Sequence, residues 1–174
     1  MKTTLVDAAF GILALSGSTT ATAQIIRWDR VEGFGAADYS GIFVGPIQAS
    51  RPRTAGEGRV ILDLKSGFLW FTVKGLTNGN QYDNGPLGAP WGPELLMGTL
   101  VCDSTQRSAP ATWVDTPNVA FDANGDGRFA GVVAVPAACK ERPQEMVFLL
   151  RHPDRPGQRF VAYGAGRRIL EGWP

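Results

Sequence analysis

The segment from Asp122 to Gly127 has the residue pattern in this chain that is most typical of a cation site. It reads Asp-Ala-Asn-Gly-Asp-Gly, which matches the first half of a calcium-binding loop, with oxygen ligands at alternate positions and a glycine at the sharp turn. The glutamate that closes such a loop is missing, because Val133 stands in its place. Asn-Gly and Asp-Gly also favour plain hairpin turns. Two interpretations stay open: a weak calcium site formed by Asp122, Asn124 and Asp126, or an ordinary turn.

Cys102 and Cys139 are the only two cysteines in the sequence. Each ends or follows a predicted strand, and in an oxidising compartment such a pair forms a disulfide. We predict that bond here, with two free buried thiols as the alternative. A metal site made from these cysteines and the single histidine, His152, would lack ligands.

Catalytic motifs are absent from the sequence. It contains no G-x-S-x-G, H-E-x-x-H or P-loop pattern, and His152 precedes Pro153 in a turn-like context typical of a surface residue. Glycoside hydrolysis needs paired carboxylates, but no spacing singles out a pair. The candidates are Glu94, Asp103, Asp115, Glu141 and Glu145. We therefore predict no catalytic residue, and a carbohydrate hydrolase acting through paired carboxylates remains the alternative.

Aromatic side chains are the remaining candidates for a ligand site. The chain has five tryptophans. Trp70 alternates with Leu69 and Phe71, which predicts that it lies on the outer face of its sheet, while Tyr82 and Trp91 fall in a long Gly- and Pro-rich loop. Exposed aromatic rings suit sugar rings or partner surfaces, so Trp70, Tyr82 and Trp91 are the predicted ligand-binding residues. The alternative is that Trp70 and Trp113 fill a second core layer.

The elements that must position these residues are short strands. The chain holds 22 glycines and 12 prolines, which indicates many turns, and no segment keeps helical periodicity. Apolar and polar residues alternate in two runs around Ser66-Gly67, which predicts a hairpin with Leu62 and Phe71 facing inward. Strands are predicted at residues 25–28, 41–47, 59–65, 68–74, 95–102, 118–121, 128–135, 146–150 and 159–163. The predicted fold is a single all-β domain, an antiparallel Greek-key-like β-sandwich or a flattened barrel, with one disulfide.

The first 23 residues have the pattern of a signal peptide. Lys2 is followed by an apolar stretch over residues 8–15, and Ala21-Thr22-Ala23 forms an A-x-A cleavage site. We expect a signal peptide over 1–23 and a single β domain over 24–174, in a secreted or periplasmic protein. A native N-terminal helix or strand is the alternative, and the apolar run is too short for a membrane span, which needs about 20 residues.

The charge balance of the chain gives no support to polyanionic partners. The formal net charge is +1, from 17 basic and 16 acidic residues. Binding to nucleic acid or to an anionic membrane depends on an excess of basic residues. The sequence favours a non-catalytic binding or structural module whose partner is a carbohydrate or another extracellular protein, with no cofactor other than weakly bound calcium.

Several segments in order resemble a known group of proteins. The run Phe71-Thr72-Val73-Lys74-Gly75-Leu76 resembles the strand followed by Gly-Leu of CHRD-like domains. The segments at residues 98–103, 122–129, 135–139, 146–151 and 159–166 resemble uncharacterised secreted bacterial β-sandwich proteins. The likeness covers roughly residues 59–168. It implies an extracellular β-sandwich and no particular activity.

Overall fold

The computed structural model describes residues 24–33, 43–49, 53–78, 94–105, 112–153 and 159–171. The strands are β1 (Gln24–Glu32), β2 (Phe43–Val44), β3 (Ile47–Gln48), β4 (Arg53–Thr54), β5 (Glu57–Asp63), β6 (Phe68–Lys74), β7 (Thr77–Asn78), β8 (Glu94–Val101), β9 (Trp113–Asp115), β10 (Val119–Phe121), β11 (Gly127–Val132), β12 (Val147–Arg151) and β13 (Phe160–Glu171). The helical elements are α1 (Ala137–Glu141) and a 3-10 turn (Pro143–Glu145). The predicted signal peptide lies outside these residues.

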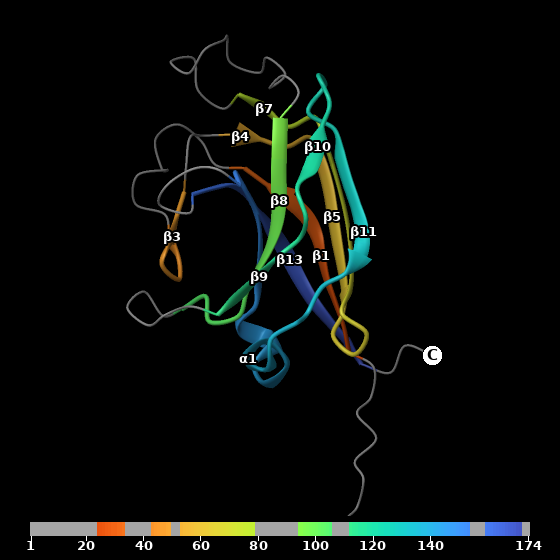
Figure 1. Ribbon diagram of the computed structural model, residues 1–174, viewed down its shortest axis with the longest axis vertical. Coiled ribbons are helices and arrows are strands. Elements are labelled where there is room, and N and C mark those ends of the chain that lie inside the picture. Colours follow the sequence, from red (N-terminus) through yellow and green to blue (C-terminus); the bar gives the residue numbers. More distant parts are fainter. Residues whose placement is uncertain are drawn as a thin grey trace, which may run out of the picture.

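One curled sheet dominates the fold (Figure 1). Its nine strands run β10-β8-β12-β13-β1-β5-β6-β11, with β9 paired to β8, and all of its pairs are antiparallel. β8 and β10 lie at the front of Figure 1, whereas β1 and β13 lie behind them. The predicted all-β antiparallel fold is confirmed, and the curl corresponds to its barrel-like form. No described helix is long and apolar enough to cross a membrane.

The β5–β6 hairpin follows the predicted alternation. Leu62, Leu69 and Phe71 are buried on the inner face of the curled sheet. At the turn, Asp63 accepts a hydrogen bond from the Ser66 hydroxyl at 2.6 Å and one from the Lys65 amide at 2.9 Å. The Ser66 hydroxyl and the neighbouring amides lower the pKa of Asp63 below its ordinary value of 3.8. This polar turn fixes the register of the two strands.

The interior of the curled sheet is an aromatic cluster. The ring of Phe148 on β12 lies 6.2 Å from that of Trp28 on β1 and 5.2 Å from that of Phe71 on β6. Gly98 on β8 faces the same rings, and a Cβ there would come within 2.7 Å of Phe71. Phe129 on β11 stacks on Phe71 at 5.7 Å. These contacts join strands from both halves of the sheet order into one core.

A second, smaller core lies on the outer face of β8, β12 and β13. The β2–β3 hairpin brings Ile47 against Leu149. Leu149 is fully buried on the face opposite to that of Phe148, so β12 is covered on both sides, as its unbroken apolar run indicates. The single strand predicted for residues 41–47 is wrong. Gly45 takes a positive φ of 57° and turns the chain into a short hairpin.

The predicted disulfide between Cys102 and Cys139 is confirmed. The two Cα atoms lie 4.5 Å apart and both residues are fully buried. The bond connects the end of β8 to α1, across a sequence separation of 37 residues. It therefore fastens the only described α-helix to the end of β8.

We expect the disulfide to be a major contribution to stability. The chain-entropy model assigns about 4 kcal/mol to a loop of this length. The double variant Cys102→Ala and Cys139→Ala, which adds no buried hydroxyl, should unfold at a lower urea concentration than the oxidised protein. The reduced wild type serves as the control, since it should resemble the variant. Equal unfolding free energies for oxidised and double-alanine proteins would contradict this expectation.

Candidate functional site

The outer face of β1, β5 and β6 carries a shallow groove of about 700 Å³, here called the outer-face groove. It is lined by Asp29, Arg30, Val31, Glu32, Ala55, Gly56, Glu57, Gly58, Arg59, Trp70, Thr72 and Lys74. The β2–β3 hairpin covers β12 and not this part of the sheet. The groove thus combines one aromatic ring with polar side chains of both charges.

Trp70 contributes that ring. On the ladder it lies opposite Ile61 on β5 and Ala130 on β11, and its side chain is partly exposed. Neither core cluster includes it. Trp113, by contrast, packs against the second core. The alternative of a second core layer therefore holds for Trp113, whereas Trp70 lies on the outer face.

The carboxylates in the outer-face groove already have partners. Arg27 Nε lies 2.8 Å from Asp29 Oδ1, as an ion pair without an aligned hydrogen bond. Arg168 lies 2.5 Å from Asp29 Oδ2. Glu32 contacts Arg30 at 3.0 Å and accepts a hydrogen bond from the Tyr163 hydroxyl at 3.2 Å. Glu57 is paired more loosely with Lys74. Burial, with the nearby Glu32 charge, raises the pKa of Tyr163, so this phenol stays protonated.

The carboxylates considered for hydrolysis do not meet in a groove. None of Glu94, Asp103, Asp115, Glu141 and Glu145 lines the outer-face groove. Asp103 and Glu145 both contact Arg142, and Asp115 contacts Arg151. Glu141 is exposed on α1. These five carboxylates are therefore not gathered in the outer-face groove.

His152 is buried, so the expectation of a surface histidine is wrong. Its side chain is 5% exposed, and Nδ1 lies 2.7 Å from Glu94 Oε1 at the start of β8. The other ring nitrogen, Nε2, is buried and has no hydrogen-bond partner among the described residues. A carboxylate that orients an imidazole is common at catalytic and metal sites. Among the described residues, however, no three His, Cys, Asp or Glu side chains are grouped to hold a metal.

The Asp122–Gly127 loop connects β10 to β11, and its carboxylates bind backbone amides. Asp122 Oδ1 accepts hydrogen bonds from the amides of Asn124 and Asp126 at 2.8 and 3.0 Å. Asp126 Oδ1 accepts one from the amide of Gly75, just after β6, at 2.8 Å. The Gly-Leu element after β6 therefore anchors the loop. Calcium binding at Asp122, Asn124 and Asp126 remains a prediction.

A second groove, the seam groove of about 720 Å³, lies where the edges of the sheet approach each other. Its lining includes Ala120 on β10, Arg128 on β11 and the two loop aspartates, Asp122 and Asp126. Thr72 lines both grooves. The outer surface of β6 is thus a ridge between the two.

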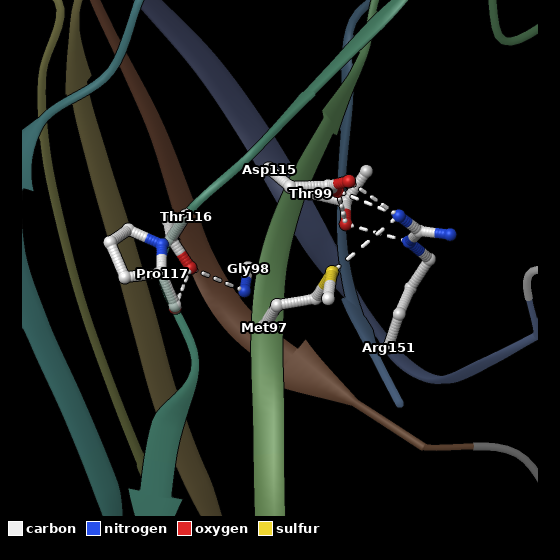
Figure 2. A network of polar contacts seen from close by, with 7 residues as sticks. All are labelled: Met97, Gly98, Thr99, Asp115, Thr116, Pro117 and Arg151. Atoms are coloured by element: carbon white, nitrogen blue, oxygen red, sulfur yellow. Dashed lines mark hydrogen bonds and ion pairs between the residues drawn. The ribbon is translucent and has the colours of Figure 1, made fainter. Parts of the chain in front are cut away.

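A buried polar network surrounds Arg151 at the end of β12 (Figure 2). Its side chain is 6% exposed, and Nη2 lies 2.7 and 2.8 Å from the two oxygens of Asp115 on β9. Arg151 Nε donates to the Thr99 hydroxyl, which donates in turn to Asp115 at 2.6 Å. The guanidinium also lies over Trp113, 5.9 Å from its ring centre. This network was not predicted from the sequence. A signal for it is that Arg151 directly follows the apolar residues of β12.

Tyr82 and Trp91, the other two predicted ligand-binding aromatics, lie outside the described residues. Comparisons of the chain with protein-family models, with curated proteins and with solved structures find no match. The resemblance to CHRD-like domains therefore remains a prediction.

Calcium binding and the structural role of the loop make different predictions. Asp126→Ala removes the acceptor of the Gly75 amide and should lower the unfolding free energy by about 1–3 kcal/mol, even with a chelator present. Asn124→Ala removes a predicted calcium ligand but no side-chain hydrogen bond seen in the structure. If the loop binds calcium, millimolar calcium should raise the melting temperature of the wild type but not of Asn124→Ala. If calcium does not change the melting temperature of the wild type, the loop is an ordinary turn and not a calcium site.

The Arg151–Asp115 pair should show strong energetic coupling. Asp115→Asn leaves the arginine charge largely buried without a full partner and should cost about 1–3 kcal/mol. Arg151→Met removes the buried charge itself. The free energy of unfolding of the double variant should therefore fall by less than the sum of the decreases in the two single variants. Urea denaturation of all four proteins measures the coupling. Losses that add within about 0.5 kcal/mol would show that the two side chains act independently.

Proposed function

We propose that the protein is a secreted or periplasmic non-catalytic module that binds carbohydrate in its outer-face groove. The observation that carries this proposal is Trp70, a partly exposed indole in a groove of polar side chains. An aromatic face packs against the C–H face of a sugar ring, while the polar neighbours form hydrogen bonds with its hydroxyls. Thr72 and Arg59, which line the same groove, supply such groups.

The ion pairs around the groove favour binding over hydrolysis. A glycosidase needs one carboxylic acid that can give a proton and one carboxylate that can attack or activate water. Asp29 and Glu32 each contact arginines, which restrict their side chains. The groove can thus hold a sugar, while each of the carboxylates that line it, Asp29, Glu32 and Glu57, is engaged by a basic side chain.

Two further features support an exported protein. The first 23 residues have the charge and apolar pattern of a signal peptide. The buried Cys102–Cys139 disulfide is typical of an oxidising compartment. Both fit a module that meets polysaccharides outside the cytoplasm.

Trp70→Ala tests the proposal directly. In affinity electrophoresis, the migration of the purified protein should be slowed by at least one of four polysaccharides in the gel: dextran, xylan, mixed-linkage glucan or polygalacturonate. Trp70→Ala should weaken that binding about tenfold or more, which corresponds to about 1.4 kcal/mol.

Phe43→Ala is the matched control. Phe43 is 41% exposed on the β2–β3 hairpin, outside the groove, so its loss should leave binding unchanged. No retardation by any polymer, or equal losses from both substitutions, would refute carbohydrate binding at Trp70.

A further inference from the structure

Two exposed arginines lie on the outer face beside Trp70. Arg59 on β5 and Arg128 on β11 are both directly opposite Thr72 on β6. Residues that lie directly opposite in antiparallel strands project from the same face. The side chains of Arg59, Thr72 and Arg128 therefore form one row across three strands, here called the basic row.

The two arginines of the basic row have no ionic partner in the described part of the chain, and neither makes a side-chain hydrogen bond there. Most other described arginines contact a carboxylate or a carbonyl oxygen: Arg27, Arg30, Arg142, Arg151, Arg167 and Arg168. Six arginines thus have a carboxylate or carbonyl partner, whereas Arg59 and Arg128 place two guanidinium groups without one on either side of Thr72.

The basic row adjoins an apolar surface. Trp70 is two residues from Thr72 along β6, which is about 7 Å. On the far side of Trp70, Phe68 pairs with Val132 on β11, and these side chains are 43% and 70% exposed. Across the strands, the two arginine backbones are about 10 Å apart. The surface therefore offers an aromatic platform with two cationic groups along one border.

We propose that this surface binds an acidic polysaccharide made of uronic acids, an inference that rests on the proposed function and names its ligand class. A uronic acid has an apolar C–H face that can stack on Trp70 and a planar carboxylate at its ring edge. Guanidinium groups bind planar carboxylates through two parallel hydrogen bonds. Because every sugar of such a polymer carries a carboxylate, one bound chain can contact both Arg59 and Arg128.

Charge complementarity selects this polymer over nucleic acid. Nucleic acid binding requires many phosphate contacts from a broad basic surface, whereas the formal net charge here is +1. In the outer-face groove, Asp29 and Glu32 keep the area beyond the basic row close to neutral. A sugar chain with widely spaced carboxylates and apolar ring faces matches that limited charge.

Polygalacturonate and its fully methyl-esterified form provide a matched pair of probes, because they share one backbone and differ in charge. The wild type should bind polygalacturonate at least tenfold more tightly than the ester in 50 mM salt, and 500 mM salt should remove most of the difference. The double variant Arg59→Gln and Arg128→Gln should bind polygalacturonate about tenfold or more weakly than the wild type does, and its affinity for the ester should be unchanged. Trp70→Ala should weaken binding to both polymers.

Arg159→Gln is the control for charge, since Arg159 is an exposed arginine just before β13, outside both grooves. This substitution should change the affinity by less than twofold, and all variants should have melting temperatures near that of the wild type.

Equal binding of both polymers, with no effect of the arginine substitutions, would overturn the inference and leave carbohydrate binding intact. If the protein binds neither of these polymers, nor dextran, xylan or mixed-linkage glucan, both proposals are refuted. Equally tight binding of single-stranded DNA would show general anion attraction and also overturn the uronic acid assignment.

Discussion

The contact between Phe148 and Phe71 is the constraint on which the rest of the structure depends. Their strands, β12 and β6, are four steps apart in the sheet order, which would separate them by about 19 Å in a flat sheet. Their rings nevertheless lie 5.2 Å apart. The sheet must therefore curl until its inner face closes on itself, and Gly98 leaves the space that both rings need. The curl lets the nine-stranded sheet enclose the main core and leaves a convex outer face.

The two halves of that outer face differ. Over β12, the β2–β3 hairpin buries Leu149, and the polar network of Arg151 closes the strand end. Over β5, β6 and β11 the described residues form no such cover, and Phe68 and Val132 remain exposed. The sequences reflect this difference in part, because β12 is apolar up to Arg151, whereas β6 presents Thr72 and Lys74 on its outer face. A ligand surface on β6 is thus a consequence of where the small hairpin packs.

Local pattern was sufficient to predict most strands, the β5–β6 hairpin and the direction of Trp70, because alternation decides which face a residue takes. It did not predict what covers that face, so Trp70 and Trp113 were indistinguishable until the fold placed them. Long-range partners were equally inaccessible. Asp126 binds an amide 51 residues away, and the buried His152 contacts Glu94, which is distant in sequence, at 2.7 Å. The hairpin at Gly45 was missed because a positive φ at one glycine ended an otherwise plausible strand.

The distribution of charge connects the fold to the proposed binding surface. A curled sheet of this size brings acidic and basic side chains together on its convex face, and an isolated ion there gains little from a partner in water. Six of the described arginines nevertheless have a carboxylate or carbonyl partner, whereas the two arginines of the basic row have none in the described part of the chain. Arg59 and Arg128 lie on neighbours of β6, so the register that buries Phe71 on the inner face also aligns the two guanidinium groups beside Thr72 on the outer one. A one-residue slip of either pairing would bury an arginine and expose a core residue. The packing of the core therefore determines the geometry with which the outer face can meet a ligand.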